Sequence, residues 1–185
     1  MKRIALLIPD AGPLISLARG GALDTLLLID VPIYVVDEVL FETTRDKSFP
    51  DAQAIEDFVN DNARVHVFET EVGKLSAMMR EKDPTYAPKG QGEAAIAQMY
   101  ARVDEVVDPL SPIMVLFEDS DTRRIQIIIE GNVWLLSTKS FLIGLEERGL
   151  ISSAEQIWNA IHEAERYPSE SEVERKPEGY EPSFW

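Results

Sequence analysis

The chain contains no cysteine and only two histidines among its 185 residues. The missing cysteine excludes disulfides, thiolate metal sites and cysteine nucleophiles. Long apolar runs are missing too. The first run, residues 4–8, ends at Pro9 and Asp10, well short of the roughly 18 apolar residues of a membrane-spanning helix and too early for a secretory signal. We therefore expect a cytoplasmic protein with no membrane partner.

Positive charge is also scarce, because 18 Lys and Arg face 33 Asp and Glu, a formal net charge of -15. This balance argues against tight binding to a phosphate backbone, although bound metal cations can reverse the charge locally. The acidity is uneven. Residues 166–185 are rich in Glu, contain several Pro and lack helical periodicity, so we interpret them as an acidic C-terminal tail that follows a single domain, residues 1–165.

Two hypotheses describe this tail. In one it is a solvated segment, mostly disordered or lying on the surface. In the other, its aromatic residues Tyr180, Phe184 and Trp185 dock with the negative charges in a groove or at a neighbouring subunit.

Within residues 1–165, apolar runs typical of buried strands alternate with segments of helical periodicity. The predicted strands are residues 4–8, 33–36, 65–68, 113–117 and 133–136. Repeated alternation of strands and helices predicts an α/β fold of three layers, with a central, mainly parallel sheet covered by helices on both faces.

Five acidic residues lie where these segments end or begin: Asp10, Glu42, Glu93, Asp119 and Asp121. Taken singly, each is explained as a helix cap or a solvated helix position. Together they are expected to meet, because Asp10 and Asp119 follow strands of one parallel sheet, at the edge where ligands bind. Carboxylates in one cluster raise one another's pKa, so the set predicts bound Mg²⁺ or Mn²⁺. Two such ions, roughly 3.5 to 4 Å apart, promote phosphodiester hydrolysis.

Four motifs in chain order resemble the PIN domain: IPDAGPLI at 8–15, DEVLFE at 37–42, GEAAIA at 92–97 and LFEDSD at 116–121. The resemblance covers most of residues 4–151. PIN domains are metal-dependent nucleases, and many are the toxins of bacterial toxin-antitoxin pairs that cut single-stranded regions of RNA. The resemblance implies a Mg²⁺- or Mn²⁺-dependent endoribonuclease whose substrate is single-stranded or structured RNA, with a cognate antitoxin as a further partner. We also expect a homodimer.

The resemblance also assigns the site. It implies that the catalytic and metal-binding carboxylates are Asp10, Glu42, Glu93 and Asp119, with Asp121 as an auxiliary metal ligand. Glu42 is preferred over Glu38, which falls in the first turn of its helix. The fourth motif has two registers, since its acids are either Glu118 and Asp119 or Asp119 and Asp121. Thr138 lies where many relatives place a small hydroxyl residue near the metals, and is predicted to bind substrate; its alternative role is a helix N-cap.

Positive residues near these acids are candidates for phosphate binding. Arg123 and Arg124 are predicted to begin a helix beside the metals and to hold substrate phosphates, or else to be an exposed pair that balances nearby acids. Lys89 and Lys139 would extend this basic rim. His66 and His162 have no partner in the sequence that suggests catalysis, and we expect both to be structural.

Two other interpretations remain. The stretch from Asp119 to Thr122 looks like the signature of haloacid-dehalogenase-type phosphatases, with Asp119 as nucleophile and Lys139 on the phosphoryl group, but this leaves Asp10 and Glu93 without a role. Alternatively, the domain is a degenerate PIN fold that binds RNA or a protein without cleaving. The complete set of four acids favours the catalytic interpretation.

Overall fold

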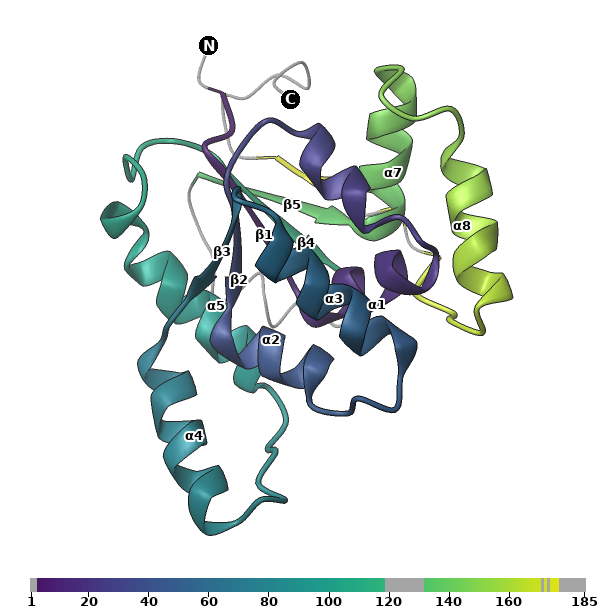
Figure 1. The fold of residues 1–185 in the computed structure, drawn as a ribbon. Helices are drawn as coiled ribbons and strands as arrows, with labels where there is room; N and C mark the ends of the chain where they lie inside the picture. Colours follow the sequence, from purple (N-terminus) through teal and green to yellow (C-terminus); the bar gives the residue numbers. More distant parts are fainter. Residues whose placement is uncertain (1–2, 119–131, 171, 173, 177–185) are drawn as a thin grey trace.

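The computed structural model describes residues 3–118, 132–170, 172 and 174–176, which form a six-stranded sheet flanked by helices (Figure 1). The strand order is β3-β2-β1-β4-β5-β6. Neighbouring strands are parallel except for the last pair, β5 and β6, which is antiparallel. The predicted α/β class with a mainly parallel sheet is confirmed.

The strands are short, and their apolar character explains their position in the interior. They are β1 (Leu6–Pro9), β2 (Ile33–Val36), β3 (Val65–Phe68), β4 (Ile113–Phe117), β5 (Val133–Ser137) and β6 (Glu174–Arg175). Every residue of β1, β4 and β5 is buried, as expected for parallel strands covered on both faces. Strand β6 was not predicted.

The described helices lie between and after the strands, in agreement with the predicted alternation. They are α1 (Ala11–Arg19), α2 (Asp37–Thr44), α3 (Pro50–Asp61), α4 (Glu71–Lys82), α5 (Gln91–Ala101), α7 (Thr138–Glu147) and α8 (Ala154–Glu163), with 3₁₀ helices η1 (Leu23–Leu28) and η2 (Val103–Glu105). Helix α3 starts with Pro50, whose fixed φ suits a first turn. Helix α8 starts after Ser153, whose Oγ accepts a hydrogen bond from the Gln156 amide. None of the helices in the described ranges has the length and apolar character that a bilayer crossing requires.

The order of the strands creates one position suited to a ligand. From β1 the chain adds β2 and β3 on one side of the sheet, whereas β4 and β5 lie on the other side. The neighbours β1 and β4 run parallel in register, from Leu6 opposite Ile113 to Pro9 opposite Leu116. In open parallel sheets such a reversal of strand order opens a crevice beyond the carboxyl ends of the two strands. Asp10 and Glu118 directly follow these ends.

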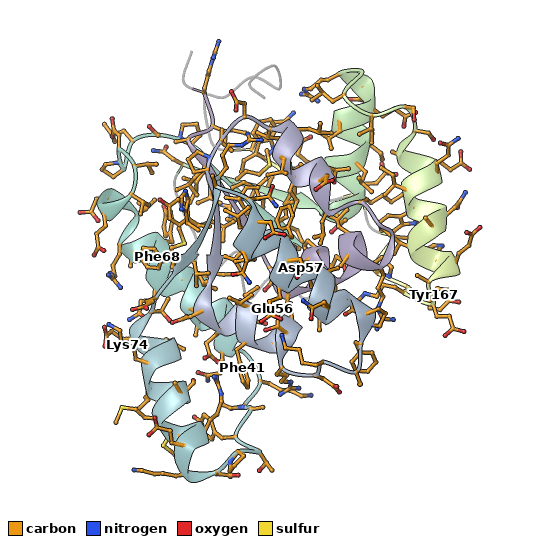
Figure 2. The ribbon with its side chains drawn as sticks, viewed as in Figure 1. Phe41, Glu56, Asp57, Phe68, Lys74 and Tyr167 are labelled. Carbon is orange, nitrogen blue, oxygen red and sulfur yellow. The ribbon has the colours of Figure 1, made fainter. Side chains whose placement is uncertain are left out.

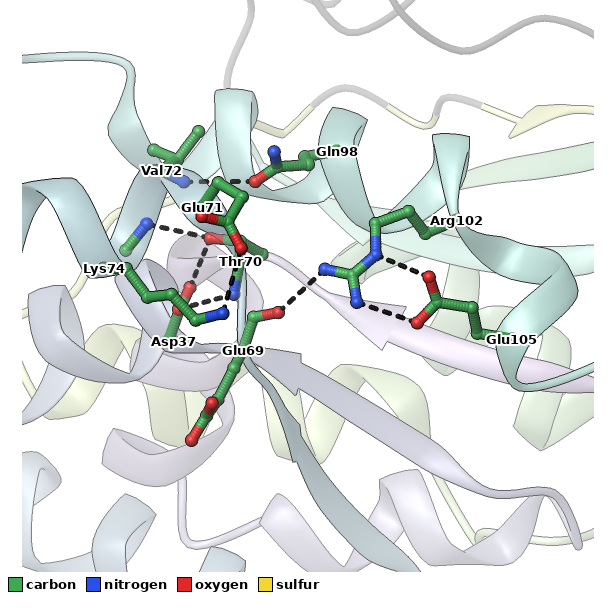
Figure 3. Close-up of polar contacts among 10 residues, drawn as sticks. Asp37, Glu69, Thr70, Glu71, Val72, Lys74, Gln98, Arg102 and Glu105 are labelled. Atoms are coloured by element: carbon green, nitrogen blue, oxygen red, sulfur yellow. Dashed lines mark hydrogen bonds and ion pairs between the residues drawn. The ribbon is translucent and has the colours of Figure 1, made fainter.

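A network of polar contacts fixes the helices on one side of this crevice (Figure 3). The Asp37 carboxylate, in the first turn of α2, accepts hydrogen bonds from the Thr70 amide (2.7 Å) and the Thr70 hydroxyl (2.8 Å) at the start of α4. The Val72 amide donates to the Gln98 side chain of α5 (3.1 Å). A Cβ at Gly73 would lie 2.0 Å from Asp37 Oδ2, so this close approach requires glycine. Helices α2 and α5 are therefore both tied to the start of α4.

The described part of the acidic tail lies along the domain. The Glu170 carboxylate accepts hydrogen bonds from Lys139 Nζ (2.8 Å) and from Trp158 Nε1 (3.0 Å). Further along, the Glu174 carboxylate accepts from Trp134 Nε1 (3.1 Å), and β6 extends the sheet. These contacts link the tail to β5, α7 and α8. The tail residues Tyr180, Phe184 and Trp185 lie outside the described part of the chain.

Candidate active site

A pocket of about 1040 Å³ lies at the carboxyl edge of β1 and β4. Five acidic side chains from four separate parts of the fold line it: Asp10 after β1, Glu38 and Glu42 on α2, Glu93 on α5 and Glu118 after β4. The structure thus brings together three of the predicted carboxylates, Asp10, Glu42 and Glu93. Asp10 stands at the N-cap position of α1, but its side chain makes no capping hydrogen bond to that helix.

Gly92, in the first turn of α5, shows how closely two of these carboxylates approach. A Cβ at this position would lie 3.5 Å from Glu42 Oε2 and 3.7 Å from Asp10 Oδ1. The distance between these two oxygens is therefore no greater than the sum of the two values. Glu93 follows Gly92 directly. The bare backbone of Gly92 therefore leaves space between acidic groups from two other elements.

The burial and clustering of these carboxylates perturb the pKa of Asp10 most strongly. Burial raises the pKa of the Asp10 carboxyl to about 7, from an ordinary value of 3.8. The Ala11 amide lowers this pKa, whereas the charges of Glu93, Glu42 and Glu118 raise it further. The protein therefore holds an acidic group that is half protonated near neutral pH, in a position where a cation would favour its charged form.

Glu42 experiences the same effects more weakly. Partial burial of its carboxyl group raises the pKa, as does the nearby charge of Glu93, while the positive charge of Arg45 lowers it. Glu42 is otherwise exposed to solvent at the pocket. It lies one turn along α2 from Glu38, which faces a different partner.

Glu38 is buried and forms an ion pair with Arg80 of α4. The Arg80 guanidinium also lies 3.4 Å from the centre of the Phe41 ring, while its Nε is buried and has no hydrogen-bond partner among the described residues. Because the Glu38 charge is paired in this way, Glu42 is the acid of α2 that faces the other carboxylates. Glu38, Phe41 and Arg80 all line the pocket.

Glu118 is buried and hydrogen-bonded on both carboxylate oxygens. Its Oε2 accepts from Ser16 Oγ (2.8 Å) and from Arg166 Nη2 (3.0 Å), and its Oε1 accepts from Thr138 Oγ1 (2.8 Å). A Cβ at Gly12 would lie 2.9 Å from the Glu118 Cβ, so the first turn of α1 needs glycine to admit this side chain. Glu118 therefore connects the floor of the pocket to α1, α7 and the C-terminal segment.

Thr138 does not reach the surface of the pocket. It is fully buried, and its hydroxyl holds Glu118. The N-cap of α7 is the preceding residue, Ser137, whose Oγ accepts from the Ser140 amide. The predicted substrate contact of Thr138 thus becomes, in this structure, a contact with a carboxylate of the site.

Four cationic side chains surround the acids: Arg45, Arg80, Lys89 and Arg166. Lys89 was expected at such a rim, whereas Lys139 lies away from it, bonded to Glu170. Sequence reasoning missed the arginines. The ion pair of Arg80 joins residues 42 positions apart, and that of Arg166 joins residues 48 positions apart. Local sequence patterns do not predict contacts at such separations.

Several predicted site residues lie outside the described part of the chain: Asp119, Asp121, Arg123 and Arg124. The two histidines lie elsewhere. His66 of β3 packs its ring 5.1 Å from that of Tyr34, and His162 of α8 lies 5.5 Å from the ring of Trp158. Both contacts are consistent with structural roles.

The acidic side chains suit a hard divalent cation, because they offer only oxygen ligands and one of them has a strongly raised pKa. Asp10, Glu42 and Glu93 are the residues that would hold such an ion. Within residues 3–118 and the later described ranges, no three acidic side chains are close enough to bind one ion together. Binding of one ion by all three would therefore require their side chains to move closer together.

Comparisons with known proteins give no relative: no family model matches this chain, and neither do the curated proteins or the solved structures.

Proposed function

We propose that this protein is a metal-dependent nuclease that hydrolyses phosphodiester bonds of single-stranded RNA. The observation that supports this proposal most is the meeting of Asp10, Glu42 and Glu93, from three separate elements, in one pocket at the switch point of the sheet. Acidic residues that act only as helix caps or solvated charges are not expected to converge in one pocket. The sequence resemblance to PIN domains supports the same chemistry.

In this proposal Asp10, Glu42 and Glu93 bind Mg²⁺ or Mn²⁺. A bound metal would supply Lewis acidity, which would polarise the phosphodiester and lower the pKa of a water molecule. The side chains of the protein supply the cation site and position it on the rigid carboxyl edge of the sheet. No side-chain nucleophile is needed, in agreement with a chain that lacks cysteine.

The cationic rim offsets the overall acidity where the substrate would bind. Although the net charge is -15, Arg45, Lys89 and Arg166 line the same pocket as the carboxylates. Guanidinium groups are well suited to phosphate oxygens, because they present several N–H donors in a fixed plane. A strand of RNA would therefore meet positive charge beside the carboxylates.

The phosphatase interpretation is less well supported. It requires Lys139 on a phosphoryl group, but Lys139 Nζ lies 2.8 Å from Glu170 and 3.7 Å from Glu172. Lys139 lines a different pocket, between α7 and α8. The interpretation also leaves Asp10, the acid with the most perturbed pKa, without a function.

The test is cleavage of end-labelled RNA and DNA oligonucleotides, single-stranded and duplex, with Mn²⁺, Mg²⁺ or chelator. We expect the wild-type protein to cut single-stranded RNA only when metal is present. The Asp10→Asn variant should lose more than the roughly 10- to 100-fold that loss of an outer-shell partner of a metal ligand costs, because Asp10 is a direct ligand in this proposal.

Asp57→Asn is the matched control, because it makes the same substitution at an exposed carboxylate of α3 outside the pocket (Figure 2). It should cleave like the wild type. Cleavage that persists in chelator, or that Asp10→Asn retains in full, would reject the proposal. Binding of RNA without cleavage under every metal condition would favour the degenerate, non-catalytic alternative.

A further inference from the structure

The C-terminal segment forms one wall of the candidate active site. Residues 166–169, which follow α8, line the pocket together with the carboxylates. This wall is distant from Phe41 of α2, which lies at another part of the same pocket; Figure 2 shows Tyr167 beyond the end of α8 and Phe41 well apart from it. Two residues of the segment have groups that could contact a ligand: Arg166 has a guanidinium group, and Tyr167 has an exposed aromatic ring.

Arg166 is held in place by one part of its guanidinium group. Its Nε donates to Ser16 Oγ (3.1 Å), and its Nη2 donates to Glu118 Oε2 (3.0 Å). A guanidinium carries five N–H donors, so these two bonds leave three others without a partner among the described residues. The side chain is 32% exposed and lines the pocket, so donors remain available to a ligand there. A fixed guanidinium with free donors is well suited to a phosphate.

Tyr167 is an exposed aromatic residue on the same wall. The residue is 74% exposed, although it lines the pocket. One part of the ring is supported, because the ring of His162 lies 5.6 Å away, and His162 in turn lies 5.5 Å from the buried Trp158. A large aromatic side chain that is supported from behind and open to solvent beside an active site can stack with a planar group of a ligand.

The segment is held to the domain on the far side of these residues. Glu170 accepts hydrogen bonds from Lys139 and Trp158, and β6 pairs with β5. With Arg166 bonded to Ser16 and Glu118 as well, the wall is attached at both ends. Arg166 and Tyr167 are therefore positioned before a ligand arrives, which reduces the entropy lost on binding.

We propose that Arg166 and Tyr167 form a binding subsite for one nucleotide of a single-stranded substrate, in which Arg166 contacts a phosphate and Tyr167 stacks on the adjacent base. This inference rests on the proposed nuclease function and adds to it a reason for strand selectivity. A base in a duplex already stacks on its neighbours and is not free to stack on Tyr167, whereas an unpaired base is.

The test compares Tyr167→Ala and Tyr167→Phe with the wild-type protein in steady-state cleavage of a single-stranded RNA. Tyr167→Ala should raise KM about tenfold, because one stacking contact is lost, and should leave kcat nearly unchanged. Tyr167→Phe should restore the wild-type KM, because phenylalanine keeps the ring. Phe49→Ala, which removes an exposed aromatic side chain outside the pocket, is the control and should behave like the wild type.

A series of oligonucleotides with one abasic position each identifies the contacted base. In the wild type, one abasic position should raise KM by about the same factor as Tyr167→Ala. In Tyr167→Ala the same abasic position should have no further effect, since the two changes remove the same contact.

Arg166→Gln should weaken binding to RNA of every sequence and reduce the salt dependence of that binding. Arg166→Lys should not restore the affinity, because the planar donor group is lost.

The outcomes separate the two proposals. If the wild type cleaves single-stranded RNA but Tyr167→Ala shows an unchanged KM and the same abasic profile, the subsite is overturned and the nuclease proposal stands. If the wild type neither binds nor cleaves any oligonucleotide with either metal, both proposals are overturned. A KM effect of Tyr167→Ala that Tyr167→Phe does not correct would also overturn stacking.

Discussion

At the scale of single residues, Asp10 carries the largest electrostatic strain in the site. Its pKa is raised to about 7 by burial and then by three neighbouring carboxylates. A group of this kind is protonated in the folded state at pH values where the unfolded chain has already lost the proton. The linkage between pH and stability therefore has the opposite sign from that of an ordinary salt-bridged aspartate.

This sign gives the first prediction. Between about pH 4 and pH 7 the folded protein binds one more proton at Asp10 than the unfolded chain, so the free energy of unfolding should fall as pH rises and level off above pH 7. One proton corresponds to at most about 1.4 kcal/mol per pH unit. Asp10→Asn should remove this slope and be more stable than the wild type at pH 8. Urea unfolding at several pH values measures it, and an identical slope in Asp10→Asn would contradict the assignment.

Gly92 provides a second residue-scale prediction, in which one substitution lowers metal affinity but leaves the stability of the fold almost unchanged. Gly92→Ala adds a methyl group 3.5 Å from Glu42 Oε2 and 3.7 Å from Asp10 Oδ1, with only a small adjustment of Val39. The change in stability should be within about 1 kcal/mol, because alanine also favours the helix. The Mn²⁺ affinity should fall, because the methyl group occupies the space between the acids.

Thermal unfolding and Mn²⁺ titration of the same Gly92→Ala sample measure the two effects. A variant that folds normally and binds Mn²⁺ as tightly as the wild type would show that this space is not the cation site.

At the scale of elements, the site depends on how α2, α4 and α5 are joined. Asp37 accepts two hydrogen bonds from Thr70, and its Oδ1 also accepts from the Glu38 amide (2.9 Å). Near the same contacts, the Arg102 guanidinium donates hydrogen bonds to the Glu105 carboxylate and to the Glu69 carbonyl (Figure 3). Asp37 therefore links α2, in which it lies, to the start of α4.

Removal of this link is the element-scale prediction. Asp37→Ala leaves the Thr70 amide without its charged acceptor, which should lower the free energy of unfolding by about 2 kcal/mol. It should also reduce cleavage, since α2 and α5 carry Glu42 and Glu93. Lys74→Ala, which removes the exposed ion pair with Glu71 on α4, is the control and should change stability little. Equal stability of Asp37→Ala and the wild type would contradict this role.

At the scale of the whole molecule, the sequence predicted the features that depend on short stretches of chain. Continuous apolar runs predicted the five main strands, and their alternation with helices predicted the parallel sheet. The position of Asp10 followed from this, because it directly follows the first run. Glu42 and Glu93 were assigned by resemblance, and the structure places both in the pocket with Asp10.

Features that depend on distant contacts were not predictable in this way. The hydrogen bond between Arg166 and Ser16 joins residues 150 positions apart, and β6 forms only where the tail returns to β5. The acidic composition of the tail suggested solvation, because composition does not reveal the Lys139 and Trp158 donors that hold Glu170. Glu118 was weighed only as an alternative register, since a one-residue shift at the end of a strand has no sequence signature.

The measurement that tests the central claim most directly is calorimetric titration of Mn²⁺ into the wild type and into Asp10→Asn, at pH 7, in two buffers with different ionisation enthalpies. We predict saturable binding to the wild type with net release of protons, because the metal displaces the proton that Asp10 retains near neutral pH. Asp10→Asn should bind much more weakly and without that release. If Mn²⁺ does not bind to the wild type, or binds equally well to Asp10→Asn, these carboxylates do not form the proposed metal site.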